Sequence, residues 1–158
     1  MAGWEQTRRR HRLVHDVAGD FARNGPRALA AWRPAIETEF GGLDDLLRDV
    51  QRRLHTAAEA RLDALIEAPP ADLDTSVAAV LDEVAEIYPD LRRLLDAHAS
   101  HPAVAEGTVR FHRSVRTATG VDLTRTRSDR SRYEEKGPVR DRKPVFFARL
   151  RPVCGWLH

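Results

Sequence analysis

EFGGLDDLLRDVQRRL, residues 39–54, holds the clearest structural signal in this chain. Two glycines precede apolar residues that recur at spacings of three and four, which is the period of one face of an α-helix. The face continues over Ala58, Leu62, Leu65 and Ile66, and a pair of prolines at positions 69 and 70 ends it. We expect the first part of this face to pack against a second copy of the chain or a protein partner. That interaction face consists of Leu43, Leu46, Leu47, Val50 and Leu54.

The same period returns through the first 123 residues, in which the helix-forming types Ala, Leu, Arg and Glu are abundant. Glycines and prolines separate the segments, and Pro34 is expected to end a short helical piece that begins at Arg27. Five to six helices with short connections predict an all-α helical bundle. The expected buried faces comprise Val14, Val17, Ala18 and Phe21; Val77, Val80, Leu81, Val84 and Ile87; Leu91, Leu94 and Leu95; and Val104, Val109, His112 and Val115.

Length and composition limit the class of protein. A chain of 158 residues with 42% hydrophobic and 32% charged residues can bury a core and is typical of a globular protein. Its single cysteine, Cys154, excludes an intramolecular disulfide and fits a reducing compartment. The sequence contains no apolar run of about 20 residues and no secretory signal. We therefore expect a cytoplasmic protein that does not enter a membrane.

Charge divides the chain into two parts. Residues 124–158 contain ten Arg or Lys and four Asp or Glu, whereas residues 1–123 carry a net charge of −4. The second part is polar at first and becomes apolar near the C-terminus. The sequence thus predicts a helical bundle domain over residues 1–123 and an extended basic tail, with an apolar end, over residues 124–158.

Two basic clusters suggest an alternative in which the protein binds nucleic acid. A dense positive patch attracts phosphates, and an extended basic arm binds nucleic acid with little sequence discrimination. The simpler interpretation of the first cluster, which we favour, is the solvated face of an amphipathic helix. The first cluster consists of Arg8, Arg9, Arg10 and Arg12. The second consists of Arg125, Arg127, Arg130 and Arg132.

The sequences FARNG at residues 21–25 and EFGGLDDLL at residues 39–47 resemble those of TetR-type transcriptional regulators. In that family an aromatic-Ala-x-x-Gly turn ends the first helix. A segment like the second one opens the helix that leads into the ligand-binding body. The resemblance covers roughly residues 8–54, and it implies an all-helical body that senses ligands and dimerises.

The chain departs from that family in the region where DNA would be read. Only 14 residues separate Gly25 from Phe40, which is too few for a helix, a turn and a recognition helix. Glu37 and Glu39 in this stretch would repel phosphates. The resemblance therefore implies a derived relative whose helix-turn-helix is shortened or lost, and no base-contacting residue is assigned.

Motifs for catalysis or metal binding are scarce. His11 and His15 are four residues apart and can share one helical face, and His98 and His101 are three residues apart. A di-metal bundle requires Glu-x-x-His motifs on paired helices, and the sequence has none. It also lacks Gly-x-Ser-x-Gly, a phosphate-binding loop and a dinucleotide fingerprint. We expect no catalytic residue, no metal and no cofactor.

These features predict a non-enzymatic helical protein of a regulatory or protein-interaction type, which forms a homodimer or binds a protein partner. One alternative is a nucleic-acid-binding transcriptional regulator that uses the two basic clusters. A further alternative is a helical bundle that binds a small ligand or a metal ion.

Overall fold

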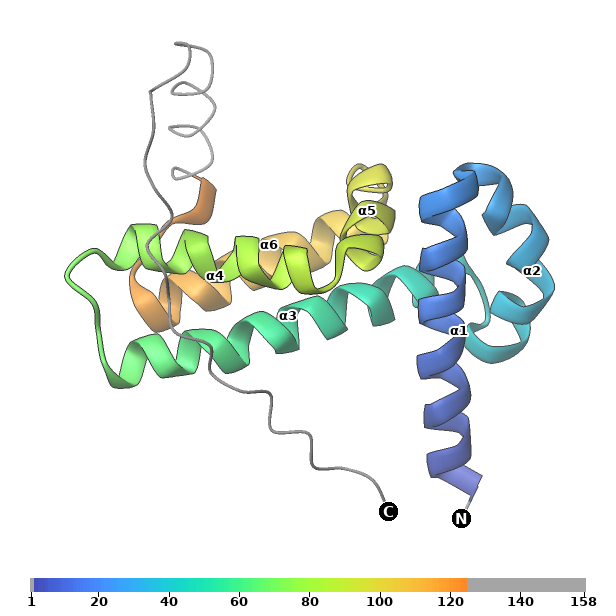
Figure 1. Cartoon of the computed structure of the whole chain (residues 1–158), viewed down its shortest axis with the longest axis horizontal. Helices are drawn as coiled ribbons and strands as arrows, with labels where there is room; N and C mark the ends of the chain where they lie inside the picture. The colour runs from blue at the N-terminus through green and yellow to red at the C-terminus, as the bar shows by residue number, and fades with distance from the viewer. Residues whose placement is uncertain (1, 125–158) are drawn as a thin grey trace, which may run out of the picture.

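Six α-helices make up the described part of the chain (Figure 1). A computed structural model describes residues 2–124, and within them it contains no β-strand, so the expected all-α class is confirmed. No helix in this part is both long enough and apolar enough to cross a membrane. The helices are α1 (Ala2–Asn24), α2 (Pro26–Phe40), α3 (Leu43–Glu67), α4 (Leu73–Ile87), α5 (Pro89–Ala97) and α6 (Pro102–Thr119).

The helices form two groups. α4 and α6 both pack along α3, whereas α1 and α2 pack together across one end of these three helices (Figure 1). Two contacts connect the groups: α5 packs against α1 as well as α3 and α4, and α2 packs against α3. A pair of helices that share one neighbour without closing on each other leaves space between them, and the candidate site lies there.

α3 is the central helix because its apolar face is buried over most of its length. Leu46, Leu47 and Val50 are fully buried, and burying a side chain of this size stabilises the fold by about 1.5–3 kcal/mol. Asp45 lies in the first turn of α3, where the helix dipole favours a negative charge. Gly41 ends α2 with a left-handed φ of 84°, which glycine adopts without strain. The glycine pair therefore makes a tight connection between α2 and α3.

The expected helix end before Pro34 is wrong, because α2 continues through this residue to Phe40. A proline inside a helix removes one backbone hydrogen bond, here the bond to the carbonyl of Ala30. Ala30 and Pro34 are both exposed, so water can satisfy that carbonyl. One continuous helix thus fills the stretch between Gly25 and Gly41.

Three predicted core positions are also wrong. Ile66, Ile87 and Val109 are 43%, 46% and 58% exposed. The first two lie at the C-terminal ends of α3 and α4, where little chain remains to cover them. In α6 the core position belongs to Phe111, which lies seven residues after Val104 and so returns to the same face. Val109, five residues after Val104, is rotated by about 140°.

Candidate functional site

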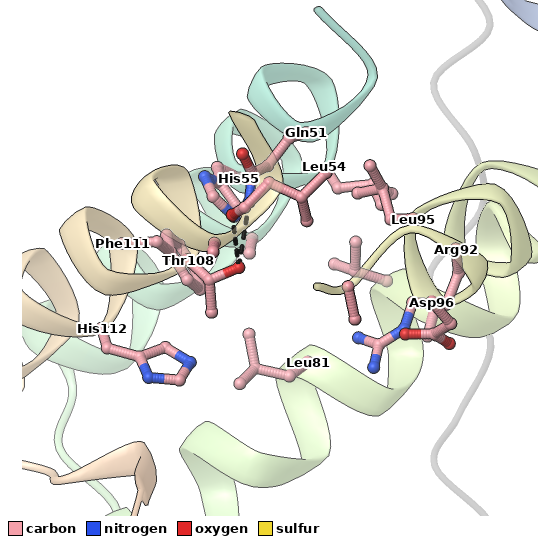
Figure 2. A pocket seen from close by; sticks show the side chains of 16 residues that line it. Gln51, Leu54, His55, Leu81, Arg92, Leu95, Asp96, Thr108, Phe111 and His112 are labelled. Atoms are coloured by element: carbon pink, nitrogen blue, oxygen red, sulfur yellow. Dashed lines mark hydrogen bonds and ion pairs between the residues drawn. The ribbon is translucent and has the colours of Figure 1, made fainter. Parts of the chain in front are cut away.

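A cavity of about 400 Å³ lies between α3, α4, α5 and α6. α3 forms one wall, α4 and α6 form the two sides, and α5 closes one end (Figure 2). Its volume is within the range of roughly 300–1,000 Å³ that is usual for small-molecule sites. The lining residues are Gln51, Leu54, His55, Ala58, Leu81, Val84, Ala85, Arg92, Leu95, Asp96, Ala99, Val104, Ala105, Thr108, Phe111 and His112.

The walls of the cavity are mainly apolar. Leu54 from α3, Leu81 and Val84 from α4, Leu95 from α5 and Phe111 from α6 supply the large apolar surfaces. Each of these helices also supplies residues to the hydrophobic core, from the turns next to those that line the cavity. The cavity is therefore an extension of the core that the side chains leave unfilled, and it favours an apolar occupant.

A polar contact joins α3 to α6 at one wall of the cavity. Gln51 is 4% exposed and is the only polar side chain that is buried among the described residues. Its Nε2 atom donates to the carbonyl of Val104 at 2.9 Å and to Oγ1 of Thr108 at 3.1 Å. Gly107 makes room for this side chain, because a Cβ atom there would collide with the Gln51 amide. The glycine thus fixes how closely the two helices approach.

Two histidines line the cavity from facing helices. The imidazole of His55 on α3 stacks on the ring of Phe111, with 4.0 Å between ring centroids and 10° between planes. Burial, together with the nearby His112, lowers the pKa of His55 from 6.5 to about 4, and burial is the larger cause. His55 is therefore neutral near pH 7. The ring of His112 points into the cavity from α6 (Figure 2).

An ion pair on α5 provides the charged part of the lining. Nε of Arg92 lies 2.8 Å from Oδ2 of Asp96, one helical turn later. Figure 2 shows the guanidinium group directed toward the cavity. Both side chains are partly exposed, so this pair lies where the cavity meets solvent.

The predicted interaction face is used inside the chain. Leu46, Leu47, Val50 and Leu54 are buried in the core, and Leu43 packs against it. They contact the chain's own helices, so a second copy cannot pack on them while the chain is folded. Self-association remains a prediction, and its surface has to be sought elsewhere.

The N-terminal arginines are divided between two roles. Nε of Arg9 lies 3.2 Å from the carboxylate of Glu39, and Nε of Arg10 donates to the Glu39 carbonyl at 2.9 Å. These two residues tie α1 to the end of α2. Arg8 lies over the exposed ring of Trp4, 4.2 Å from its centroid, and Arg12 is exposed. The second basic cluster, at positions 125, 127, 130 and 132, lies outside the described residues.

The histidine pairs noted in the sequence have structural partners. The rings of His11 and His15 are 4.6 Å apart, and Nδ1 of His11 contacts Arg53 on α3 at 2.7 Å. His98 contacts the carbonyl of Leu94, and His101 caps α6. Within residues 2–124, no three His, Cys, Asp or Glu side chains gather closely enough to hold a metal ion.

The sequence does not predict that the residues lining the cavity come together. The period of the last helix places His112 on its inner face, but the surroundings that it shares with His55 depend on how α3 and α6 pack. Arg92, Asp96 and Thr108 are ordinary residues of helical surfaces in the sequence. Comparison with family models, curated proteins and solved structures gave no match.

Proposed function

We propose that this protein binds a small, largely apolar ligand in the cavity between α3, α4, α5 and α6. We further propose that it acts as a ligand-responsive helical regulatory protein. The observation that carries the proposal is the cavity, whose walls are apolar and whose few polar groups converge from α3, α5 and α6. Such a combination is the usual form of a small-molecule site.

The site favours this proposal over the two other classes of function. The leucine-rich face that suggested a protein partner is occupied by the chain's own core. Two of the four N-terminal arginines are engaged with Glu39, which leaves a smaller basic patch for nucleic acid. The cavity, by contrast, is available to a ligand.

α5 supports the regulatory part of the proposal. One side of this helix lines the cavity with Arg92, Leu95 and Asp96. Its neighbouring residues contact α1: Arg93 donates to the carbonyl of Ala22 at 3.1 Å, and His98 packs against Phe21. A ligand that shifts α5 would therefore also shift α1. The position of α1 would then differ between the free and the ligand-bound states.

The test uses N-phenyl-1-naphthylamine, an uncharged dye whose fluorescence rises in apolar surroundings. We expect the full chain to bind it with a dissociation constant in the micromolar range. Ala85→Phe, which fills the cavity from α4, should weaken binding by about tenfold or more, because the phenyl group takes the space of the dye. Ala79→Phe is the matched control, since Ala79 is exposed on the same helix and does not line the cavity.

Circular dichroism would establish that both variants remain helical. Equal binding by the two variants would contradict the proposal, because the dye would then lie outside the cavity. Absence of any fluorescence change with the unmodified chain would contradict it as well.

A further inference from the structure

The guanidinium and the carboxylate that line the cavity both come from α5. Arg92 is the only arginine and Asp96 the only acidic residue among the described lining residues, which also include the histidines His55 and His112. Asp96 accepts from Nε of Arg92, and this bond uses the side edge of the guanidinium group. The two terminal amino groups are left at the end of the side chain, which points into the cavity (Figure 2).

The ion pair therefore presents its positive end to the cavity. A guanidinium fork binds a carboxylate through two parallel hydrogen bonds, and such charge-assisted bonds are stronger than those to a neutral hydroxyl group. A positively charged ligand would meet the guanidinium first, so the arrangement disfavours cations. The apolar walls, formed by residues such as Leu81, Val84 and Phe111, require an apolar body behind the charged group.

We propose that the ligand is an apolar molecule with one carboxylate group, and that Arg92 binds this carboxylate while Asp96 holds the guanidinium in position. The inference rests on the proposed function, because it concerns the same cavity. It adds the chemical class of the ligand and the residue that selects it.

The test is competition against N-phenyl-1-naphthylamine on the full chain. Octanoate and octan-1-ol serve as probes, since they share an eight-carbon chain but end in a carboxylate and in a neutral hydroxyl group, respectively. We expect octanoate to displace the dye at a concentration about tenfold lower than octan-1-ol. Arg92→Gln should abolish this preference and leave displacement by octan-1-ol unchanged.

Arg93→Gln is the matched control. It removes the same charge from the next residue of α5, but Arg93 contacts Ala22 on α1 and does not line the cavity. The preference for octanoate should survive this change. If Arg92→Gln lowers the helical content, Arg92→Lys is used in its place, because lysine keeps the positive charge but lacks the two parallel donors of the guanidinium group. The preference for octanoate should then be smaller than tenfold but not lost.

The outcomes separate this inference from the proposed function. If octanoate and octan-1-ol displace the dye equally well, the carboxylate class is overturned and the cavity remains a ligand site. If Arg92→Gln and Arg93→Gln reduce the preference equally, the role of Arg92 is overturned, because the effect then comes from net charge. If Ala85→Phe leaves the dissociation constant of the dye unchanged, the proposed function itself is overturned.

Discussion

Gln51 and Gly107 show how one residue depends on another across two helices. The amide of Gln51 is buried between α3 and α6, and its two hydrogen bonds to α6 hold it in place. Glycine inside a helix ordinarily costs about 1 kcal/mol relative to alanine. Position 107 nevertheless holds glycine, because the Cβ atom of any larger residue would displace the side-chain amide of Gln51.

The first prediction concerns this pair. Gly107→Ala should lower the free energy of unfolding by about 1–3 kcal/mol, because the new methyl group forces Gln51 from its bonds. In a chain that already carries Gln51→Ala, the same change should be stabilising by up to about 1 kcal/mol. The collision is then absent, and alanine has a higher helix propensity than glycine. Urea unfolding of the four proteins of this double-mutant cycle measures the coupling. Additive effects would contradict the predicted collision.

The second prediction concerns His55. Its pKa is about 4 in the folded chain and 6.5 in the unfolded chain, so the unfolded chain takes up a proton first as the pH falls. The contribution of His55 to stability is therefore complete above about pH 6.5 and declines between 6.5 and about 4. We expect His55→Gln to reduce the loss of unfolding free energy over this interval, as measured by urea unfolding at several pH values. An unchanged pH dependence would contradict the burial of a neutral imidazole.

At the scale of the element, α2 contains two prolines in different positions. Pro26 lies in the first turn, where the missing N–H has no partner to lose. Pro34 lies in the middle of the helix, where it removes one backbone bond. The flanking helix persists because Ala28, Ile36 and Phe40 are buried on its other side.

The third prediction compares these prolines. Pro34→Ala should raise the free energy of unfolding by about 1–2 kcal/mol, because it restores the bond to Ala30 and removes the ring from the helix interior. Pro26→Ala should change it by less than about 0.5 kcal/mol. Thermal unfolding followed by circular dichroism measures both. A loss of stability for Pro34→Ala would indicate that the proline shapes α2 in a way that the core requires.

How far the sequence predicts the elements depends on the strength of the local signal. The period of α3 identifies its buried face, and Gly41 marks the connection to α2. Pro34 misleads, because its effect depends on whether Ala30 is exposed, which is a property of packing. The local sequence pattern does not predict the cavity either, since the cavity depends on the space that α4 and α6 leave beside α3. Arg92 lines this cavity only because α5 turns that side of the helix toward it.

At the scale of the whole molecule, α5 is the shared element. It closes one end of the cavity and packs against α1. α1 and α2 are joined in turn by the bonds from Arg9 and Arg10 to Glu39 and by the bond from Trp32 to Asp20, at 2.9 Å. These contacts form a continuous path from the cavity to the N-terminal helix pair.

The fourth prediction follows from this path. Saturation with octanoate should slow amide hydrogen exchange in α5 and in the part of α1 that α5 contacts, because a ligand stabilises the state that it binds. The first turns of α1, which are exposed, should exchange at an unchanged rate. Mass spectrometry of peptic fragments measures the difference. Protection confined to α3 and α6 would contradict coupling through α5.

The first turns of α1 are exposed and project beyond the other labelled helices (Figure 1), which has a mechanical consequence. The buried contacts of this helix begin at Leu13, and Trp4 lies about 20 Å along the axis from Val17, at 1.5 Å per residue. A tilt of the α1–α2 pair by about 10° about its contact with α5 would move Trp4 by roughly 3.5 Å, given this length. A displacement too small to disturb the core would therefore become a larger movement at the first turn of α1, provided that the contact between His11 and Arg53 yields.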